Sequence, residues 1–228
     1  MQHLAIIPDG NRRWAKKNLK KSFWGHKKGT ETVQTAIEFC IKKEIKYLSF
    51  YTFSIENFSR SEIEKNYLFN LLADNFEQEL PKLIKEGVRV KFIGQRSLFP
   101  EKLKPVIKKV EEATKDLDKL FLNLLFCYGG RQEILDAVKN VAQKVKTGEL
   151  NVDEIDEKNF YSHFWSYGIP DPDLIIRTSK RARLSNYLLF QAAYSEFMFL
   201  DCFWPEITEK DLAFCVDQFN SMERNFGR

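Results

Sequence analysis

The chain has 228 residues, of which 43% are hydrophobic and 30% charged, and its formal net charge is +4. These values are ordinary for a globular protein, so they exclude a disordered or fibrous chain, and the length suits one well-buried domain over residues 1–228. Lysine and glutamate are mixed along most of the sequence, which argues against a nucleic-acid partner, while the mild basicity favours small anionic ones.

The apolar runs are all shorter than the roughly 20 residues that cross a bilayer. The first of them, Leu4–Ile7, is too short for a signal peptide and is followed at once by Pro8. No two cysteines form a C-x-x-C pair, and each stands alone in an apolar run: Cys40, Cys127, Cys202 and Cys215. We therefore expect a cytoplasmic protein with buried free thiols, whose contact with membranes is at most peripheral.

Short apolar runs rich in β-forming residues alternate with longer helical patterns. The predicted strands are Leu4–Ile7, Tyr47–Phe53, Val88–Ile93, Phe121–Tyr128, Leu174–Arg177 and Phe197–Leu200. The predicted helices lie between them, at about 30–43, 62–86, 101–115, 131–146, 157–165 and 208–223. This succession predicts an α/β fold: a single domain with a central, mostly parallel six-stranded sheet flanked by helices.

The helix that starts at residue 62 has a capping-box signature, Ser61 followed by Glu64. Its apolar arc is broader than one core-facing seam and comprises Leu68, Phe69, Leu71, Leu72, Ala73, Phe76, Leu80, Leu83 and Ile84. Periodicity leaves two interpretations open, ordinary packing on the sheet or one wall of an apolar cavity. Pro81 is expected to kink this helix or to end its regular part.

Ligands of open parallel sheets bind beyond the carboxyl ends of the strands, so the loops there are the places to search. The first such loop, Pro8–Trp14, combines Asp9 with Gly10, Arg12 and Arg13. Free amides and guanidinium groups suit phosphate oxygens, and a neighbouring carboxylate can hold Mg²⁺ together with substrate phosphate. The loop therefore outlines a diphosphate site, and the alternative is a plain turn capped by Asp9.

The second loop, Ser54–Arg60, follows a strand and precedes the capped helix. Ser54 and Arg60 can bind phosphate, and the amide of Asn57 can orient a reacting group by hydrogen bonding. The alternative is that the serines and the asparagine only shape the loop.

The third loop, Arg177–Asn186, is the densest basic segment and is anchored by apolar runs at both ends. This anchoring favours a second anion site over a solvated charge run. Glu196, at the edge of the next strand, is either a metal ligand or a surface charge. His26 lies in what we interpret as a glycine-flanked turn, where it either serves proton transfer or is structural. His3 and His163 receive no role.

Several ordered segments closely resemble the cis-prenyltransferase family, and together they span nearly the whole chain. The matching segments are His3–Ala15, Gly25–Gly29, Phe53–Arg60, Tyr128–Arg131, Asp173–Ser179 and Arg183–Glu196. The resemblance implies an Mg²⁺-dependent enzyme that adds isopentenyl diphosphate units in cis to farnesyl diphosphate. The implied product is undecaprenyl diphosphate, the precursor of a lipid carrier for cell-wall polysaccharide, and the implied assembly is a homodimer that touches the inner membrane face when product leaves.

The resemblance also implies roles for single residues. Asp9 and Glu196 would hold Mg²⁺, with Glu196 supplied across the dimer. Asn57 would take part in proton transfer, and because an amide is a poor base we expect it to orient a relay. The implied substrate contacts are Gly10, Asn11, Arg12, Arg13, Trp14, Ser22, His26, Ser54, Ile55, Glu56, Phe58, Arg60, Arg177, Arg183, Leu184 and Ser185.

The chain departs from the family pattern at a few positions. Ser22 stands where an arginine is common, and Lys20 or Lys21 would have to compensate; Lys180 and Arg181 replace a glycine and a glutamate. The resemblance favours the tunnel-wall interpretation of the helix at 62–86. It leaves open the primer, the product length and the strength of dimerisation, and the alternatives are a product of another length, a non-catalytic partner subunit, and a plain phosphate-binding module.

Overall fold

The computed structural model describes residues 1–222, which form one α/β domain built on a six-stranded, all-parallel sheet with the strand order β3-β4-β2-β1-β5-β6. The strands are β1 His3–Ile7, β2 Tyr47–Ser54, β3 Val88–Ile93, β4 Leu120–Tyr128, β5 Leu174–Arg177 and β6 Glu196–Phe199. The predicted fold class is confirmed, and every strand lies within two residues of its predicted bounds. The sheet is parallel throughout because helices or long loops return the chain between consecutive strands.

The helices are α1 Asn11–Lys17, α2 Ser22–Lys42, α3 Glu62–Lys85, α4 Lys104–Thr114, α5 Gly130–Thr147, α6 Glu157–Tyr161 and α7 Glu209–Ser221. Helix α3 continues through Pro81 for four residues, so the expectation that its regular part ends at that proline is wrong. Helix α6 is shorter than predicted, and the last predicted helix extended to residue 223, which lies outside the described residues.

The largest error of the sequence prediction lies between residues 11 and 30. The segment containing His26 is not a turn, because α2 already begins at Ser22, and a separate helix α1 precedes it. Gly25 was misread as a turn former: a Cβ there would lie 1.9 Å from the backbone oxygen of Asn11. The glycine is needed because α1 and α2 pack at backbone contact, which leaves no room for a side chain.

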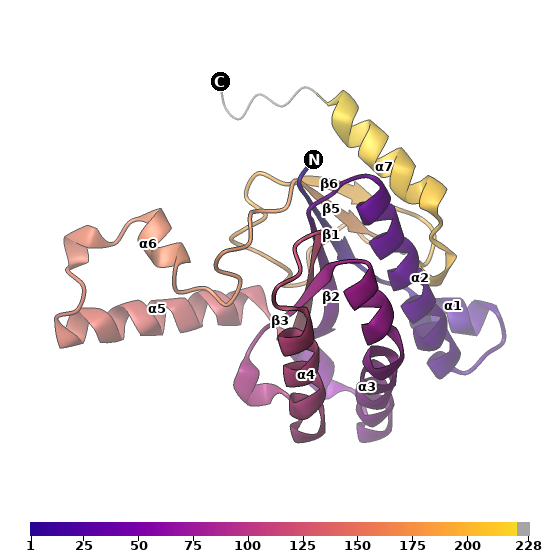
Figure 1. Ribbon diagram of the computed structural model, residues 1–228, viewed down its shortest axis with the longest axis horizontal. Coiled ribbons are helices and arrows are strands. Elements are labelled where there is room, and N and C mark those ends of the chain that lie inside the picture. The colour runs from indigo at the N-terminus through magenta and orange to yellow at the C-terminus, as the bar shows by residue number, and fades with distance from the viewer. Residues whose placement is uncertain (223–228) are drawn as a thin grey trace.

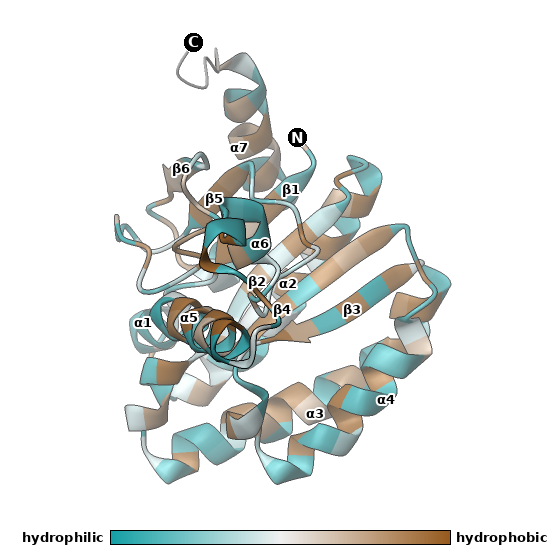
Figure 2. Cartoon of the chain, turned by 90° about the vertical axis from the view of Figure 1, so that its left-hand side faces the viewer, coloured by the Kyte–Doolittle hydropathy of each residue, from teal (hydrophilic) through white to brown (hydrophobic). Residues whose placement is uncertain are grey.

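Alternate strand residues face opposite sides of the sheet and build two apolar clusters. Leu4 and Ile6 of β1 point to the face packed against α2, α3, α4 and α7, while Ala5 and Ile7 point to the other face. The edge strand β3 alternates buried and exposed residues, which appears as brown and teal bands in Figure 2. Helix α5 projects from the body together with α6 (Figure 1), far from the turn between α1 and α2 at the other end of the long axis.

Candidate active site

Three charged side chains meet at the carboxyl edge of the sheet, beyond the neighbouring strands β1 and β5. Arg177 Nη2 donates to Asp9 Oδ2 at 2.9 Å, and Arg13 Nη2 donates to Asp9 Oδ1 at 3.0 Å. Arg13 comes from α1, and Arg177 ends β5, paired in register with Ile7. The first and third predicted loops therefore lie in direct contact at Asp9.

The carboxyl group of Asp9 is ionised at neutral pH in this arrangement. Burial by itself would raise its pKa, but the hydrogen bond and charge of Arg177 and the charge of Arg13 outweigh burial and hold the pKa below its ordinary value. The side chain of Asp9 remains 27% exposed, whereas that of Arg177 is 5% exposed. A charged carboxylate with open access is thus held between two guanidinium groups.

Two hydroxyl residues that sequence reasoning missed fasten this arrangement. Thr178 Oγ1 accepts from the Asp9 amide at 2.9 Å and donates to the Asp9 carbonyl at 2.6 Å, while Ser179 Oγ accepts from Arg13 at 2.6 Å. Gly10, the residue that precedes α1, has φ of 111°, a conformation that residues with a side chain disfavour. Both hydroxyls follow Arg177 directly, a position that could have suggested them.

The third loop wraps around Arg177. Arg177 Nη1 donates to Ser185 Oγ at 2.8 Å and to the backbone carbonyl of Arg183. Ser185 has φ of 51°, in the left-handed region, and these contacts hold the loop in that conformation. The guanidinium of Arg183 is exposed and Leu184 is half-buried beside it. We call Asp9, Arg13, Arg177, Ser179 and Ser185 the polar rim.

The second loop forms a 3₁₀ turn, Ile55–Ser59, closed by a reciprocal cap. Asn57 Oδ1 accepts from the Ser54 amide at 3.3 Å, and the Ser54 side chain accepts from the Asn57 amide in return. Glu56 accepts from Asn186 Nδ2 at 2.7 Å, which ties this loop to the third one. The oxygen of Asn57 is committed to the backbone, which supports an orienting role rather than a basic one.

The remaining apolar positions of this loop support the core: Ile55 is half-buried, and Phe58 meets Phe53 edge to face with ring centroids 5.2 Å apart. Arg60 follows, and its Nη1 donates to Glu64 Oε1 at 3.3 Å. The capping box predicted at this helix is only half formed. Ser61 Oγ accepts from the Glu64 amide, but the Glu64 carboxylate turns instead to Arg60 and Arg12.

His26 lies beside this cluster as a neutral imidazole. Burial first, and then the charges of Arg60 and Arg12, lower its pKa to about 4. Its Nε2 is 3.9 Å from Glu64 Oε1, but a neutral ring makes no ion pair with a carboxylate at that distance. His26 Nε2 is buried without a hydrogen-bond partner, and so are Asn11 Oδ1 and Arg177 Nε, within the described residues. Such unsatisfied groups at one place indicate a ligand site.

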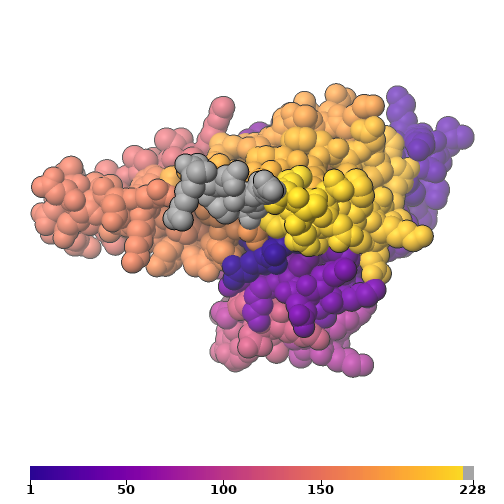
Figure 3. All heavy atoms as spheres, turned by 90° about the horizontal axis from the view of Figure 1, so that it is seen from above, coloured from indigo at the N-terminus to yellow at the C-terminus, as the bar shows by residue number. Residues whose placement is uncertain are grey.

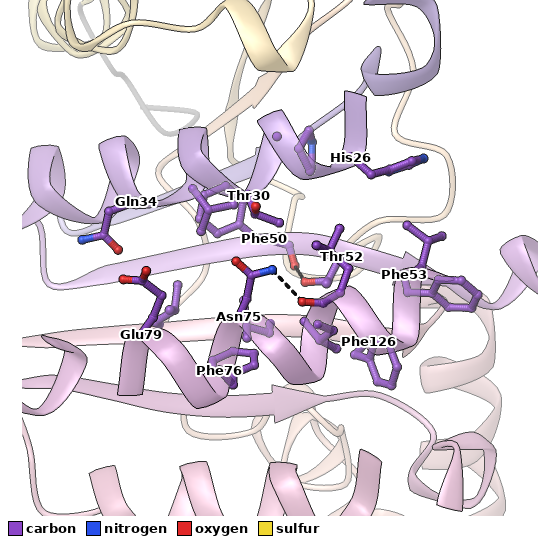
Figure 4. A pocket seen from close by; sticks show the side chains of 18 of the residues that line it. His26, Thr30, Gln34, Phe50, Thr52, Phe53, Asn75, Phe76, Glu79 and Phe126 are labelled. Atoms are coloured by element: carbon purple, nitrogen blue, oxygen red, sulfur yellow. Dashed lines mark hydrogen bonds between the residues drawn. The ribbon is translucent and has the colours of Figure 1, made fainter. Parts of the chain in front are cut away.

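An apolar cavity of about 180 Å³ opens beside these groups, between α2, α3 and the sheet (Figure 4). Asn11 and His26 line one end, and the walls include Val33 and Ile37 of α2, Phe50 and Phe53 of β2, Phe126 of β4, and Leu68, Phe69, Leu71, Leu72 and Phe76 of α3. From Leu68 to Leu83 the α3 wall extends about 22 Å at 1.5 Å per residue. The tunnel-wall interpretation of this helix is therefore supported.

Gln34 and Glu79 face each other at the far end of the cavity, as Figure 4 shows. Beyond them Lys82 Nζ donates to Glu38 Oε1 at 2.7 Å, which joins α3 to α2. The cavity thus runs from the neutral hydrogen-bonding groups of Asn11 and His26 at one end to the polar side chains of Gln34 and Glu79 at the other.

Two predicted site residues, Glu196 and Ser22, are not brought to the polar rim. Glu196 begins β6 in register with Leu174, at the amino end of the strands, so in one chain it is not brought to Asp9. Ser22 starts α2, and Lys20, proposed to compensate for it, places its Nζ 5.6 Å from the Trp14 ring instead. Residues 1–222 contain no cluster of three or more histidine, cysteine, aspartate or glutamate side chains that could hold a metal without help from a ligand.

The fold and the site together define a class: an α/β protein with anion-binding side chains at the carboxyl edge of its sheet and an apolar cavity beside them. A family model described as "Putative undecaprenyl diphosphate synthase" matches residues 7–227, so the chain belongs to that family and is a cis-prenyltransferase. Members of this family act on prenyl diphosphates. No helix among the described residues is long and apolar enough to cross a bilayer.

Individual relatives differ in the primer that their names give. A tritrans,polycis-undecaprenyl-diphosphate synthase (geranylgeranyl-diphosphate specific) of Thermoplasma volcanium is 43% identical over 100% of this chain and 89% of its own length. A ditrans,polycis-undecaprenyl-diphosphate synthase ((2E,6E)-farnesyl-diphosphate specific) of Micrococcus luteus is 42% identical over 99% and 91%. The crystal structure of lavandulyl diphosphate synthase from Lavandula x intermedia with dimethylallyl diphosphate superposes with a TM-score of 0.96 at 32% identity, covering 100% and 98%.

Proposed function

We propose that this enzyme condenses isopentenyl diphosphate repeatedly, in cis, onto farnesyl diphosphate and produces undecaprenyl diphosphate, a precursor of the lipid carrier for cell-wall polysaccharide. The observation that carries the proposal is the junction of the polar rim with the apolar cavity. Asn11 belongs to the same short helix as Arg13 and lines the cavity, so a diphosphate at the rim can extend its prenyl chain between α2 and α3.

The polar rim supplies the electrostatics of the first step. The bond between C1 and oxygen of the allylic primer breaks, the diphosphate keeps the electron pair, and the double bond of isopentenyl diphosphate forms the new carbon–carbon bond to C1. Arg12 and Arg13 would neutralise the departing diphosphate, and Arg177, Arg183 and Ser185 would bind that of isopentenyl diphosphate; Arg13 and Arg177 already meet at Asp9. A proton is then lost from the isopentenyl unit and leaves the new double bond.

The residues expected near the reacting carbons, Asn57 and His26, are better suited to orient the proton transfer than to act as strong general bases. Asn57 offers its amide nitrogen while its oxygen holds the Ser54 amide. His26 has a free acceptor nitrogen, but a pKa of about 4 makes it a weak base. Its neutral ring can hold a hydrogen bond without adding positive charge beside the developing allylic cation.

The donor set fits Mg²⁺. This ion takes oxygen ligands and is commonly held by one or two carboxylates together with substrate phosphates, and Asp9 is an ionised carboxylate with one face open. Asp9 and the diphosphate oxygens would hold the ion, which would withdraw charge from the leaving diphosphate. When diphosphate binds, Arg13 and Arg177 can exchange one carboxylate contact for phosphate contacts.

A homodimer supported by exposed apolar residues would bring Glu196 to this place. Leu135 and Val138 on α5 are 57% and 48% exposed, and Phe197 and Phe199 on the edge strand β6 are 36% and 39% exposed. A two-fold axis beside β6 and perpendicular to it would set the partner's β6 antiparallel, so the partner's Glu196 would lie at the carboxyl edge that carries Asp9. The second carboxylate of the metal site would then come from the other subunit.

Complementation tests this shared site. Asp9→Ala and Glu196→Ala chains are each expected to be nearly inactive, and co-purified mixed dimers should regain activity because one of their two sites is intact. If both residues acted within the same chain, neither site of a mixed dimer would be intact and no activity would return.

The proposal places the enzyme in the cytoplasm, with peripheral contact to the inner membrane face when product leaves, because an undecaprenyl chain is insoluble in water. Two alternatives remain within the family, a product of another length and a non-catalytic partner subunit. The ionised Asp9 and its intact arginine contacts favour an active enzyme.

The test is incubation of the purified protein with labelled isopentenyl diphosphate, Mg²⁺ and either farnesyl or geranylgeranyl diphosphate, with and without chelator, followed by sizing of the lipid. We expect chelator-sensitive product of undecaprenyl length with faster use of farnesyl diphosphate. A shorter or longer ladder would change the carrier, preference for geranylgeranyl diphosphate would change the primer, and binding without turnover would favour the non-catalytic subunit.

A further inference from the structure

The turn between α1 and α2 is the centre of a strongly basic surface. Residues 10–30 contain two arginines and six lysines but no aspartate or glutamate. All six lysines are exposed: Lys16, Lys17, Lys20, Lys21, Lys27 and Lys28. We call these lysines, together with Leu19 and Trp24, the basic patch.

The charges of the basic patch are largely uncompensated. Lys17 pairs with Glu206 at 3.2 Å and Lys28 pairs with Glu31 at 2.6 Å, both on the exposed surface. Within residues 1–222 the other four ammonium groups form no ion pair at all. A surface that gathers this many unpaired cations attracts anions over about a Debye length, roughly 8 Å at physiological salt.

Two apolar side chains are exposed to solvent between these lysines. Leu19, at the tip of the turn with φ of 53°, is 98% exposed, and Trp24 is 54% exposed. Lys20 Nζ lies 5.6 Å from the Trp14 ring and 5.7 Å from the Trp24 ring, and Lys27 Nζ lies 5.7 Å from the Trp24 ring. The indoles and lysines therefore form one continuous surface instead of separate neighbours in sequence.

The position of the basic patch relates it to the active site. Asn11 of α1 and His26 of α2 line the apolar cavity, so the helices that carry the basic patch also form part of the cavity wall. The turn projects at one end of the molecule, opposite α5, as the indigo and salmon ends in Figure 3 show. It is thus well separated from the apolar residues of α5 that support the homodimer.

We infer that the basic patch docks the enzyme on an anionic lipid bilayer, with Leu19 and Trp24 entering the headgroup region and the lysines meeting lipid phosphates. Indoles favour this boundary because they present an apolar body and a polar N–H, and lysines beside them are attracted by the negative surface potential. An exposed leucine at the tip of a cationic turn has no use in binding a free phosphate, which favours a bilayer over a soluble anion. The inference rests on the proposed function in one respect only, that a lipid product must leave near the basic patch.

Vesicle co-sedimentation of the full chain without substrates tests the inference. We expect binding to phosphatidylcholine vesicles that contain phosphatidylglycerol, weak binding to phosphatidylcholine alone, and loss of binding at high salt. The double variant Lys16→Glu, Lys27→Glu should lower the vesicle partition coefficient by at least about fivefold for each lysine replaced. The variant Leu19→Ser, Trp24→Ser should weaken it about tenfold at unchanged net charge.

Matched controls come from other faces of the protein. Phe214→Ser on α7 removes an aromatic residue that is 58% exposed, and Lys108→Glu with Lys109→Glu on α4 makes the same charge change at another exposed site. Both controls should bind vesicles like the parent protein. Equal losses in a control and the matching basic-patch variant would overturn the inference, as would failure of the parent to bind anionic vesicles or stronger binding to an RNA oligonucleotide than to them.

The outcome is independent of catalysis. Turnover of Leu19→Ser, Trp24→Ser in detergent solution should equal that of the parent, because neither side chain belongs to the polar rim or the cavity. A parent protein that binds vesicles without making polyprenyl diphosphate would refute the proposed function and leave the docking surface standing. Full turnover with no vesicle binding would refute the docking surface and leave the proposed function standing.

Discussion

The polar rim and the apolar cavity lie side by side, yet they are built on opposite principles. The rim is made of contacts between residues far apart in sequence, such as Asp9 with Arg177, and each contact fixes the direction of a hydrogen bond. The cavity is walled mainly by apolar side chains, most of them repeated along two helices, with polar groups such as Asn11 and Glu79 near its ends. If the proposed function holds, directed hydrogen bonds would hold the diphosphate and exclusion of water would hold the prenyl chain, so changes to the two regions should have different kinetic signatures.

Removal of the rim carboxylate should give the largest effect. Asp9→Ala is expected to lower turnover about 1000-fold, since the site would lose the oxygens proposed to hold Mg²⁺, while the freed arginines should retain diphosphate binding. Initial rates at saturating Mg²⁺ and direct binding of a labelled prenyl diphosphate separate the two. Asp201→Ala is the control, because Asp201 pairs only with exposed Lys180 at 3.3 Å. Near-parental turnover of Asp9→Ala would remove Asp9 from the chemistry.

Substitution of the buried rim arginine should have the next largest effect. Arg177→Lys keeps the charge but cannot bridge Asp9, Ser185 and the Arg183 carbonyl at once, so we expect kcat/KM for isopentenyl diphosphate to fall about 100-fold. Arg181→Lys, in the same loop but exposed, should stay within about twofold of the parent. Unchanged kcat/KM in both variants would mean that charge alone matters in this loop, and comparable losses in both would mean that the contacts of Arg177 are not special.

Filling the cavity should change the product rather than the rim. Leu72 lines the cavity, so Leu72→Trp is expected to shorten the products and to raise KM for the allylic primer about tenfold, with little change in KM for isopentenyl diphosphate. Sizing of the lipid products by chromatography gives the answer. Ile84→Trp on the same helix is 41% exposed and outside the cavity lining, and its products should match those of the parent.

His26, at the boundary of the two regions, should make the free energy of unfolding depend on pH. His26 has a folded pKa of about 4, below that of an unfolded histidine near 6.5, so the unfolded state takes up a proton first and stability falls as pH drops from 6.5 toward 4. The loss attributable to this ring is on the order of 3 kcal/mol.

Urea unfolding between those pH values should show a smaller loss for His26→Gln than for the parent. His163→Gln, which replaces a histidine outside the site, should change its free energy of unfolding with pH as the parent does. Buried His3, whose pKa burial also lowers to about 4, contributes to the fall that remains in His26→Gln. Identical slopes for His26→Gln and the parent would mean that the ring is not buried as a neutral group.

Local patterns in the sequence were sufficient to predict the six strands and the helices from α3 onward. Six apolar runs with strand character gave the six strands, and Ser61 marked the start of α3 correctly. The same local rules failed at residues 25–29, where glycines suggested a turn. They are inside α2 because α1 packs against them at backbone distance, a contact that no window of neighbouring residues reveals.

The sequence by itself determined the six strands, the helices from α3 onward, the loops that carry the charged residues and the broad apolar arc of α3, since each depends on residues close together in the chain. Only the tertiary structure decided which loops meet. The register of β1 with β5 brings Arg177 to Asp9 across 168 positions, Glu64 turns from its expected cap to the arginines of the site, and Glu196 lies at the opposite edge of the sheet. These outcomes follow from strand order, which is set by packing of the whole sheet rather than by any local preference.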